Sequence, residues 1–189
     1  MPLSPPVSRS LRHTRAITVE AYARDDGLWD LDASIRDVKT RDIQLPSGDR
    51  PAGVPLHDLK LRVTIDRALT IVDAEAASDS VPYPGFCETI GPAYKKLIGL
   101  SLMNHFRLHL KDRLTGVLGC THLTELAQVL PTAALQAYAD DEFDDRNDAS
   151  ANPASAERPF EIDRCHALRS DGPVVAAYYP RWSIKAVSG

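Results

Sequence analysis

The stretch 119–126, with the sequence GCTHLTEL, places a thiol and an imidazole two residues apart where a helix is expected to begin. Thr121 can cap that helix, and Glu125 lies near the place of a capping-box acid. A helix N-terminus carries partial positive charge, which favours a thiolate over a thiol. Cys120 is therefore predicted to be a metal ligand or a reactive thiolate, and His122 is close enough to share its chemistry.

Similar residue types occur at the ends of other expected elements. His57 and Asp58 begin a strand, Cys87 begins a helix, and Cys165 with His166 lies in the tail before a Gly-Pro turn. Functional residues are commonly held at the ends of elements on a rigid scaffold. Because zinc and similar ions are usually held by four Cys, His and carboxylate ligands, we predict a zinc or iron site with these ligands: His57, Asp58, Cys87 and Cys120.

Each of these residues also has a simpler interpretation. A single cysteine is more often a small buried hydrophobic residue than a ligand. His57 alone is more typical of a hydrogen-bonded core histidine, and His122 fits the exposed side of its helix. His105 and His109 have the spacing of a helical metal pair, but their neighbours are ordinary. The conjunction of several such element ends is what favours a site.

Composition restricts the class of protein. The chain has 189 residues, 43% hydrophobic and 25% charged, with a net charge of −4, which is typical of a globular protein. No basic stripe indicates nucleic acid, and no apolar run has the length of a membrane span. No apolar segment near the start resembles a secretory signal, and three cysteines fit no disulfide framework. We therefore expect a cytoplasmic protein with a small-molecule substrate, without nucleic-acid or membrane partners, and with a homodimer left open.

The hydrophobic periodicity predicts strands first and helices later. Alternating residues predict four strands, at 16–23, 28–37, 56–66 and 69–76, whereas helical spacing predicts three helices, at 87–98, 104–114 and 121–138. This order predicts an α+β fold, an antiparallel sheet followed by three helices packed on one face. We expect a flexible arm at 1–14, one domain at 15–139, an acidic and polar linker at 140–158, and a C-terminal β extension at 159–189 packed on the same domain.

Several motifs resemble a bacterial family known only as a domain of unknown function. They run from about Arg15 to Trp182 and include RDDGLWD at 24–30, His57-Asp58, GCTHLTEL at 119–126 and CHA at 165–167.

The middle of the chain, residues 56–138, resembles the iron–sulfur scaffold proteins of the NifU/IscU type. His57-Asp58 stands where that family has its first cysteine, Cys87 at the second and Cys120 at the third. The resemblance implies a NifU/IscU-like core with β extensions at both ends, in which His57 or Asp58, Cys87 and Cys120 converge in space. Histidine in place of the first cysteine departs from the scaffold pattern.

These observations leave three functions open. The first is a metal-dependent enzyme that acts on a small molecule such as an aromatic compound. Its specific reaction would be retro-aldol carbon–carbon cleavage by a lyase, with hydrolysis as the second choice. His122 and Asp58 would be its acid–base residues. The N-terminal hairpin and the aromatic tail would cover the site, with these substrate-binding residues: Trp29, Tyr83, His166 and Tyr178. The second is an iron–sulfur scaffold or sulfur-transfer accessory protein. The third is a metal-free domain with buried cysteines, or with a nucleophilic Cys–His pair.

Overall fold

The computed structural model describes residues 2–141, 158–159 and 161–184, and it divides the chain into two units, residues 1–141 and 142–189. Each unit is described by itself. Most of the linker predicted at 140–158 lies outside the described residues.

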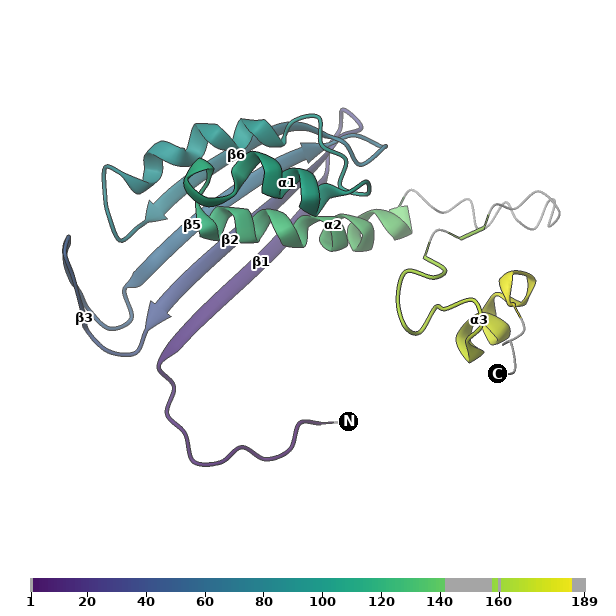
Figure 1. Ribbon diagram of the computed structural model, residues 1–189, viewed down its shortest axis with the longest axis horizontal. Coiled ribbons are helices and arrows are strands. Elements are labelled where there is room, and N and C mark those ends of the chain that lie inside the picture. The colour runs from purple at the N-terminus through teal and green to yellow at the C-terminus, as the bar shows by residue number, and fades with distance from the viewer. Residues whose placement is uncertain (1, 142–157, 160, 185–189) are drawn as a thin grey trace. The chain divides into compact units, whose positions relative to one another are not determined.

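The first unit contains a four-stranded antiparallel sheet in the order β1-β2-β5-β6 (Figure 1). Its strands have these bounds: β1 His13–Ala23, β2 Trp29–Lys39, β5 Pro55–Ile65 and β6 Ile71–Ser80. Gly27 in the β1–β2 turn has a φ of 80°, a conformation that glycine adopts without steric cost. The segment between β2 and β5 contains a small hairpin, β3 Ile43–Leu45 and β4 Gly48–Arg50.

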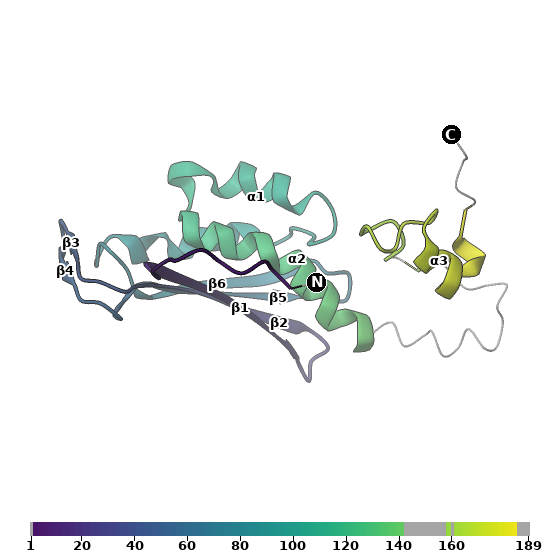
Figure 2. The same ribbon diagram turned by 90° about the horizontal axis from the view of Figure 1, so that it is seen from below.

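Helices cover one face of this sheet (Figure 2). They follow in chain order as η1 Cys87–Leu97, α1 Phe106–Leu114, η2 Gly116–Leu118 and α2 Thr121–Asp141. The first of the three predicted helices is a 3₁₀ helix rather than an α-helix, and Pro92 lies inside it. An antiparallel sheet with helices on one face is the predicted α+β class.

Alternation along the strands decides which side chains enter the core. Successive residues of a strand point to opposite faces, and the odd-numbered residues of β2 and β5 face the helices. The buried ones are Trp29, Leu31, Ala33, Ile35, Leu59, Leu61, Val63 and Ile65. The helix predicted at 121–138 is α2, and its buried apolar residues supply the opposing layer: Leu123, Leu126, Ala127, Leu130 and Ala134.

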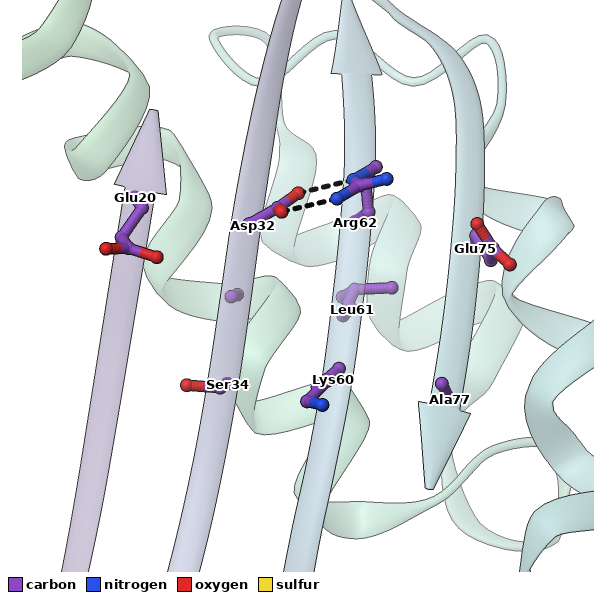
Figure 3. Close-up of a pocket in the computed structure, with 9 residues that line it drawn as sticks. Glu20, Asp32, Ser34, Lys60, Leu61, Arg62, Glu75 and Ala77 are labelled. Atoms are coloured by element: carbon purple, nitrogen blue, oxygen red, sulfur yellow. Dashed lines mark hydrogen bonds and ion pairs between the residues drawn. The ribbon is translucent and has the colours of Figure 1, made fainter. Parts of the chain in front are cut away.

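The other face of the sheet is polar. Figure 3 shows a shallow hollow there, in which Arg62 binds Asp32 through two hydrogen bonds of 2.6 Å, with Lys60 and Ser34 beside them. Exposed ion pairs of this kind contribute little to stability.

The prediction of a C-terminal β extension is wrong for the described residues of the second unit. The residues around Val174-Val175 form a helix, α3 Pro173–Tyr178, followed by η5 Pro180–Trp182. A proline at the first helical position has its backbone dihedral already set for a helix and lacks only an N–H that would be unpaired there. Val175 and Ile162 are the buried apolar residues in this described part.

Candidate functional site

Three neighbouring strands contribute one residue each to a single row across the sheet. Asp37 of β2 lies directly opposite Arg15 of β1 on one side and His57 of β5 on the other. Asp37 and His57 belong to the odd-numbered residues that face the helices. The row therefore lies on the covered face, where the apolar core ends.

Asp37 is a buried carboxylate surrounded by donors. The Arg15 guanidinium donates from Nε to Oδ1 and from Nη2 to Oδ2, each at 2.8 Å. His13 Nε2 lies 2.8 Å from Oδ1, and His57 Nδ1 lies 3.0 Å from Oδ2. Burial alone raises the pKa of Asp37, but the hydrogen bonds from Arg15 and His13 outweigh it and lower the pKa to about 2. The group is therefore an anion throughout the physiological range.

Helix α2 adds a second histidine to this row. His122 Nε2 lies 3.8 Å from Asp37 Oδ2, and the imidazole rings of His57 and His122 are 3.8 Å apart, inclined by 34°. One ligand atom from each of Asp37, His57 and His122 lies within 4.8 Å of the others. Three such donors, two imidazoles and a carboxylate, are a common ligand set for zinc and for non-haem iron.

Burial keeps the two imidazoles neutral. It is the largest cause lowering the pKa of His57, and the nearby His122 lowers it further. Burial also lowers the pKa of His122, with Arg15 as the next cause. Near neutral pH each ring is therefore uncharged and has one nitrogen with a free lone pair. This neutral form of histidine binds metal ions or accepts protons.

The start of α2 is held in place by Tyr94 of η1. Its buried hydroxyl accepts a hydrogen bond from the Cys120 backbone N–H at 3.0 Å and donates to the Cys120 carbonyl at 2.8 Å. The Thr124 hydroxyl lies 2.8 Å from the Tyr94 hydroxyl oxygen. Gly119 permits the close approach of α1 and α2, because a Cβ there would lie 2.4 Å from the Leu114 carbonyl oxygen.

Cys120 lies beside this cluster. Its Sγ is 4.0 Å from His122 Nδ1, and the residue is half-buried. Glu125, one helical turn further on, binds the Arg15 guanidinium at 2.6 Å instead of capping the helix. Arg15 therefore joins the two acidic groups, one from the sheet and one from α2.

The structure brings together three of the predicted site residues, His57, Cys120 and His122. It does not bring Asp58 to them, because Asp58 has the opposite parity on β5, points to the polar face and lies 3.7 Å from Arg36. Cys87 opens η1 as predicted and is half-buried, but it belongs to no group of potential ligands among the described residues.

The predicted substrate-binding residues lie in different places. Trp29 is buried at the opposite end of β2 from Asp37, and its ring packs edge-on against Tyr138 at 5.6 Å. Tyr83 is exposed in the loop that precedes η1. His166 and Tyr178 belong to the second unit, where both are exposed, so their roles stay predictions.

Sequence reasoning missed Asp37, Arg15 and His13. A signal for Asp37 was present, because it shares its strand parity with the buried residues Trp29, Leu31 and Ile35. An acidic residue in the buried register of a strand requires compensation by hydrogen bonds and charge. Strand parity alone does not identify the partners, because Arg15 and His13 come from a neighbouring strand.

Comparisons with known proteins identify the family. The sequence model of the family described as "Protein of unknown function (DUF2889)" matches residues 13–136. The chain therefore belongs to this family, and the match includes every residue of the cluster around Asp37. No curated protein and no solved structure matches the chain. Among the described residues, none of the helices combines the length and apolar character needed to cross a membrane.

Proposed function

We propose that this protein is a metal-dependent enzyme that acts on a small molecule, with a zinc or iron ion held by Asp37, His57 and His122. The observation that carries the proposal is the convergence of two neutral imidazoles and one carboxylate within 4.8 Å. These groups come from two strands and a helix. Such a convergence requires the whole fold and does not arise from neighbouring residues of one element.

The surroundings of the three residues support this interpretation. Arg15 balances the charge of Asp37 and is itself bound by Glu125, so the carboxylate is held in one orientation. Groups that orient a ligand by hydrogen bonds are typical of metal centres. Cys120 offers a thiol beside this group, because its Sγ lies 4.0 Å from His122 Nδ1.

An ion at this position would act as a Lewis acid on a carbonyl or alkoxide of the substrate. The protein would supply acid–base groups from residues beside the ion. Cys120 is a better candidate for this role than Asp58, because its Sγ lies near His122 whereas Asp58 pairs with Arg36 on the other face of the sheet. We keep a lyase of the retro-aldol type as the specific proposal and a hydrolase as the second, because both reactions use a Lewis acid together with a proton donor or acceptor.

One contact favours a second candidate function. The separation of 4.0 Å between Cys120 Sγ and His122 Nδ1 is compatible with a metal-free thiol–imidazole pair for nucleophilic chemistry. An iron–sulfur scaffold has no comparable support, because Cys87 belongs to no ligand group among the described residues.

Elemental analysis of the protein purified without chelator tests the proposal. We expect one equivalent of zinc or iron, lost in His57→Gln and His122→Gln. His109→Gln is the matched control, because His109 is an exposed histidine of α1. Metal retained by both site variants would contradict the proposal.

A protein without metal would also contradict it, and alkylation would then examine the second candidate. Rapid modification of Cys120 that slows in His122→Gln would indicate an activated thiol. Cys87, also half-buried, serves as the reference thiol when the alkylated protein is digested and its peptides are compared.

A further inference from the structure

The two edges of the sheet are protected differently. Along β6, the helix η1 packs so closely that a Cβ on Gly91 would lie 3.0 Å from the Ala76 carbonyl oxygen. At the other edge, β1 pairs with β2 and contacts α2, and no strand among the described residues pairs with its outer side (Figure 1). An uncovered edge presents a row of unpaired backbone donors and acceptors.

The sequence of β1 has few of the features that prevent pairing at an edge. The strand is eleven residues long, pairs with β2 without a bulge, and contains neither proline nor lysine. Its central part, residues 16–22, carries a single charge, on Glu20. Ile17 and Tyr22 remain 38% and 49% exposed. Natural edge strands usually avoid this combination of length, regularity and exposed apolar groups.

We propose that β1 pairs antiparallel with β1 of a second copy of this chain, with the two-fold axis at Thr18, so that the two sheets form one continuous sheet. This register is the one in which all eleven residues of His13–Ala23 find a partner, because Thr18 is the middle of the strand. A self-complementary contact about a two-fold axis is the commonest way in which identical chains associate.

The side chains fit this register on both faces. Thr18 lies opposite its own copy, Ile17 lies opposite Val19, and Glu20 lies opposite Ala16. On the same arithmetic Arg15 lies opposite Ala21, so no two like charges oppose each other. Pairs of β-branched residues and threonine pairs stabilise antiparallel strands. The occupant of this edge is therefore another copy of the chain rather than an unrelated peptide.

The molar mass in solution tests this proposal, measured by sedimentation or light scattering over a range of concentrations. We expect the wild-type chain to be a dimer and Thr18→Lys to be a monomer, because the substitution places two ammonium groups opposite each other at the axis. The matched control is Val72→Lys. Val72 is an exposed residue of the opposite edge strand, so its substitution should leave the dimer intact.

Cross-linking tests the register independently of the mass. In a Cys165→Ser background, which removes the exposed thiol, Thr18→Cys should form an intermolecular disulfide under mild oxidation. The background alone should not. A monomeric wild type, a dimer unaffected by Thr18→Lys, or a dimer that does not cross-link through position 18 would each overturn the proposal. Binding of an added β-strand peptide by a monomeric wild type would indicate a different partner for this edge.

Discussion

At the residue scale, the site depends on one buried charge. Asp37 is only 2% exposed, and its partners come from β1, β5 and α2. Transferring an ion from water into the protein interior costs several kcal/mol, which only well-aligned partners offset. Arg15 supplies the opposite charge through two parallel hydrogen bonds, the geometry in which such pairs are strongest. The cluster is therefore a structural element as well as a candidate site.

Replacing Asp37 with asparagine should destabilise the protein. The variant leaves the Arg15 guanidinium beside a neutral amide and weakens the acceptor for His57. We expect the free energy of unfolding to fall by about 2 kcal/mol or more in urea titrations. Asp58→Asn is the matched control, with an expected change within about 0.5 kcal/mol, because its ion pair with Arg36 is long and partly exposed. Equal effects of the two variants would contradict this assignment.

The two histidines should make the stability of the metal-free protein depend on pH. Both have a folded pKa below the ordinary value of 6.5, so the unfolded chain binds protons first as the pH falls. The stability that they confer is complete above pH 6.5 and is lost as the pH falls through the lower pKa values. Each contributes a slope of up to about 1.4 kcal/mol per pH unit.

Urea titrations between neutral and mildly acidic pH, in the presence of a chelator, measure this slope. The double variant His57→Gln/His122→Gln should remove most of it. The Asp37 contribution falls in a separate window, because its pKa is lowered from 3.8 to about 2 and its stabilisation is lost below pH 3.8. An unchanged slope in the double variant would show that other groups set the dependence.

At the scale of elements, the start of α2 is fixed by contacts from outside the helix. Tyr94 reaches it from η1, and Gly119 allows it to lie close to the end of α1. Because His122 is the second residue of α2, these contacts determine where its imidazole lies relative to the sheet. The site is thus positioned by the junction of three helices with the ends of the strands.

Tyr94→Phe should loosen this junction while preserving the core packing of the ring. The variant leaves the half-buried Cys120 N–H without its partner, so we expect a loss of about 1–2 kcal/mol in the free energy of unfolding. Metal binding should weaken as well, because His122 is less firmly placed. Tyr22→Phe is the matched control, since its exposed hydroxyl donates to the exposed Glu20 and should contribute little. A Tyr94→Phe variant as stable as that control would show that the hydroxyl does not hold the helix.

Periodicity was sufficient to predict most elements, for physical reasons that also explain the failures. The alternation in residues 56–66 and the helical spacing in residues 121–138 each define the apolar face of one element, and both predicted elements were confirmed. Residues 174–179 were wrongly predicted as strand. Their β-branched composition suggests one, but Pro173 begins a helix, and propensity is a weak guide over six residues. The helix at η1 was predicted but its 3₁₀ geometry was not, because an apolar spacing of three to four residues does not distinguish the two helix types.

The site was predictable only in part, because the residues that complete it are set by strand register. The position of His57 on the core face followed from parity along β5, whereas its pairing with Asp37 required knowledge of which residues lie opposite. The same register sends Asp58 to the other face. A resemblance in element order cannot distinguish neighbouring residues that point in opposite directions.

At the scale of the whole molecule, the two units differ in what they bury. The large core and every residue of the cluster around Asp37 belong to residues 1–141, and the family match spans 13–136. In the described part of the second unit, the buried apolar side chains are Ile162 and Val175. A domain needs a substantial apolar core to be stable alone, so we assign the stability of the site to the first unit.

A chain truncated after Asp141 should therefore fold and bind metal as the full chain does. The partners of Asp37 lie between His13 and His122, so the truncation removes none of them. We expect one cooperative thermal transition with a Tm within about 4 °C of that of the full chain. The two proteins should also bind equal amounts of zinc in parallel titrations. A fragment that aggregates, or that unfolds at a much lower temperature, would show that residues 142–189 complete the core of the first unit. A stable fragment that binds no zinc, beside a full chain that does, would place a necessary ligand in the second unit, where the candidates are Cys165 and His166.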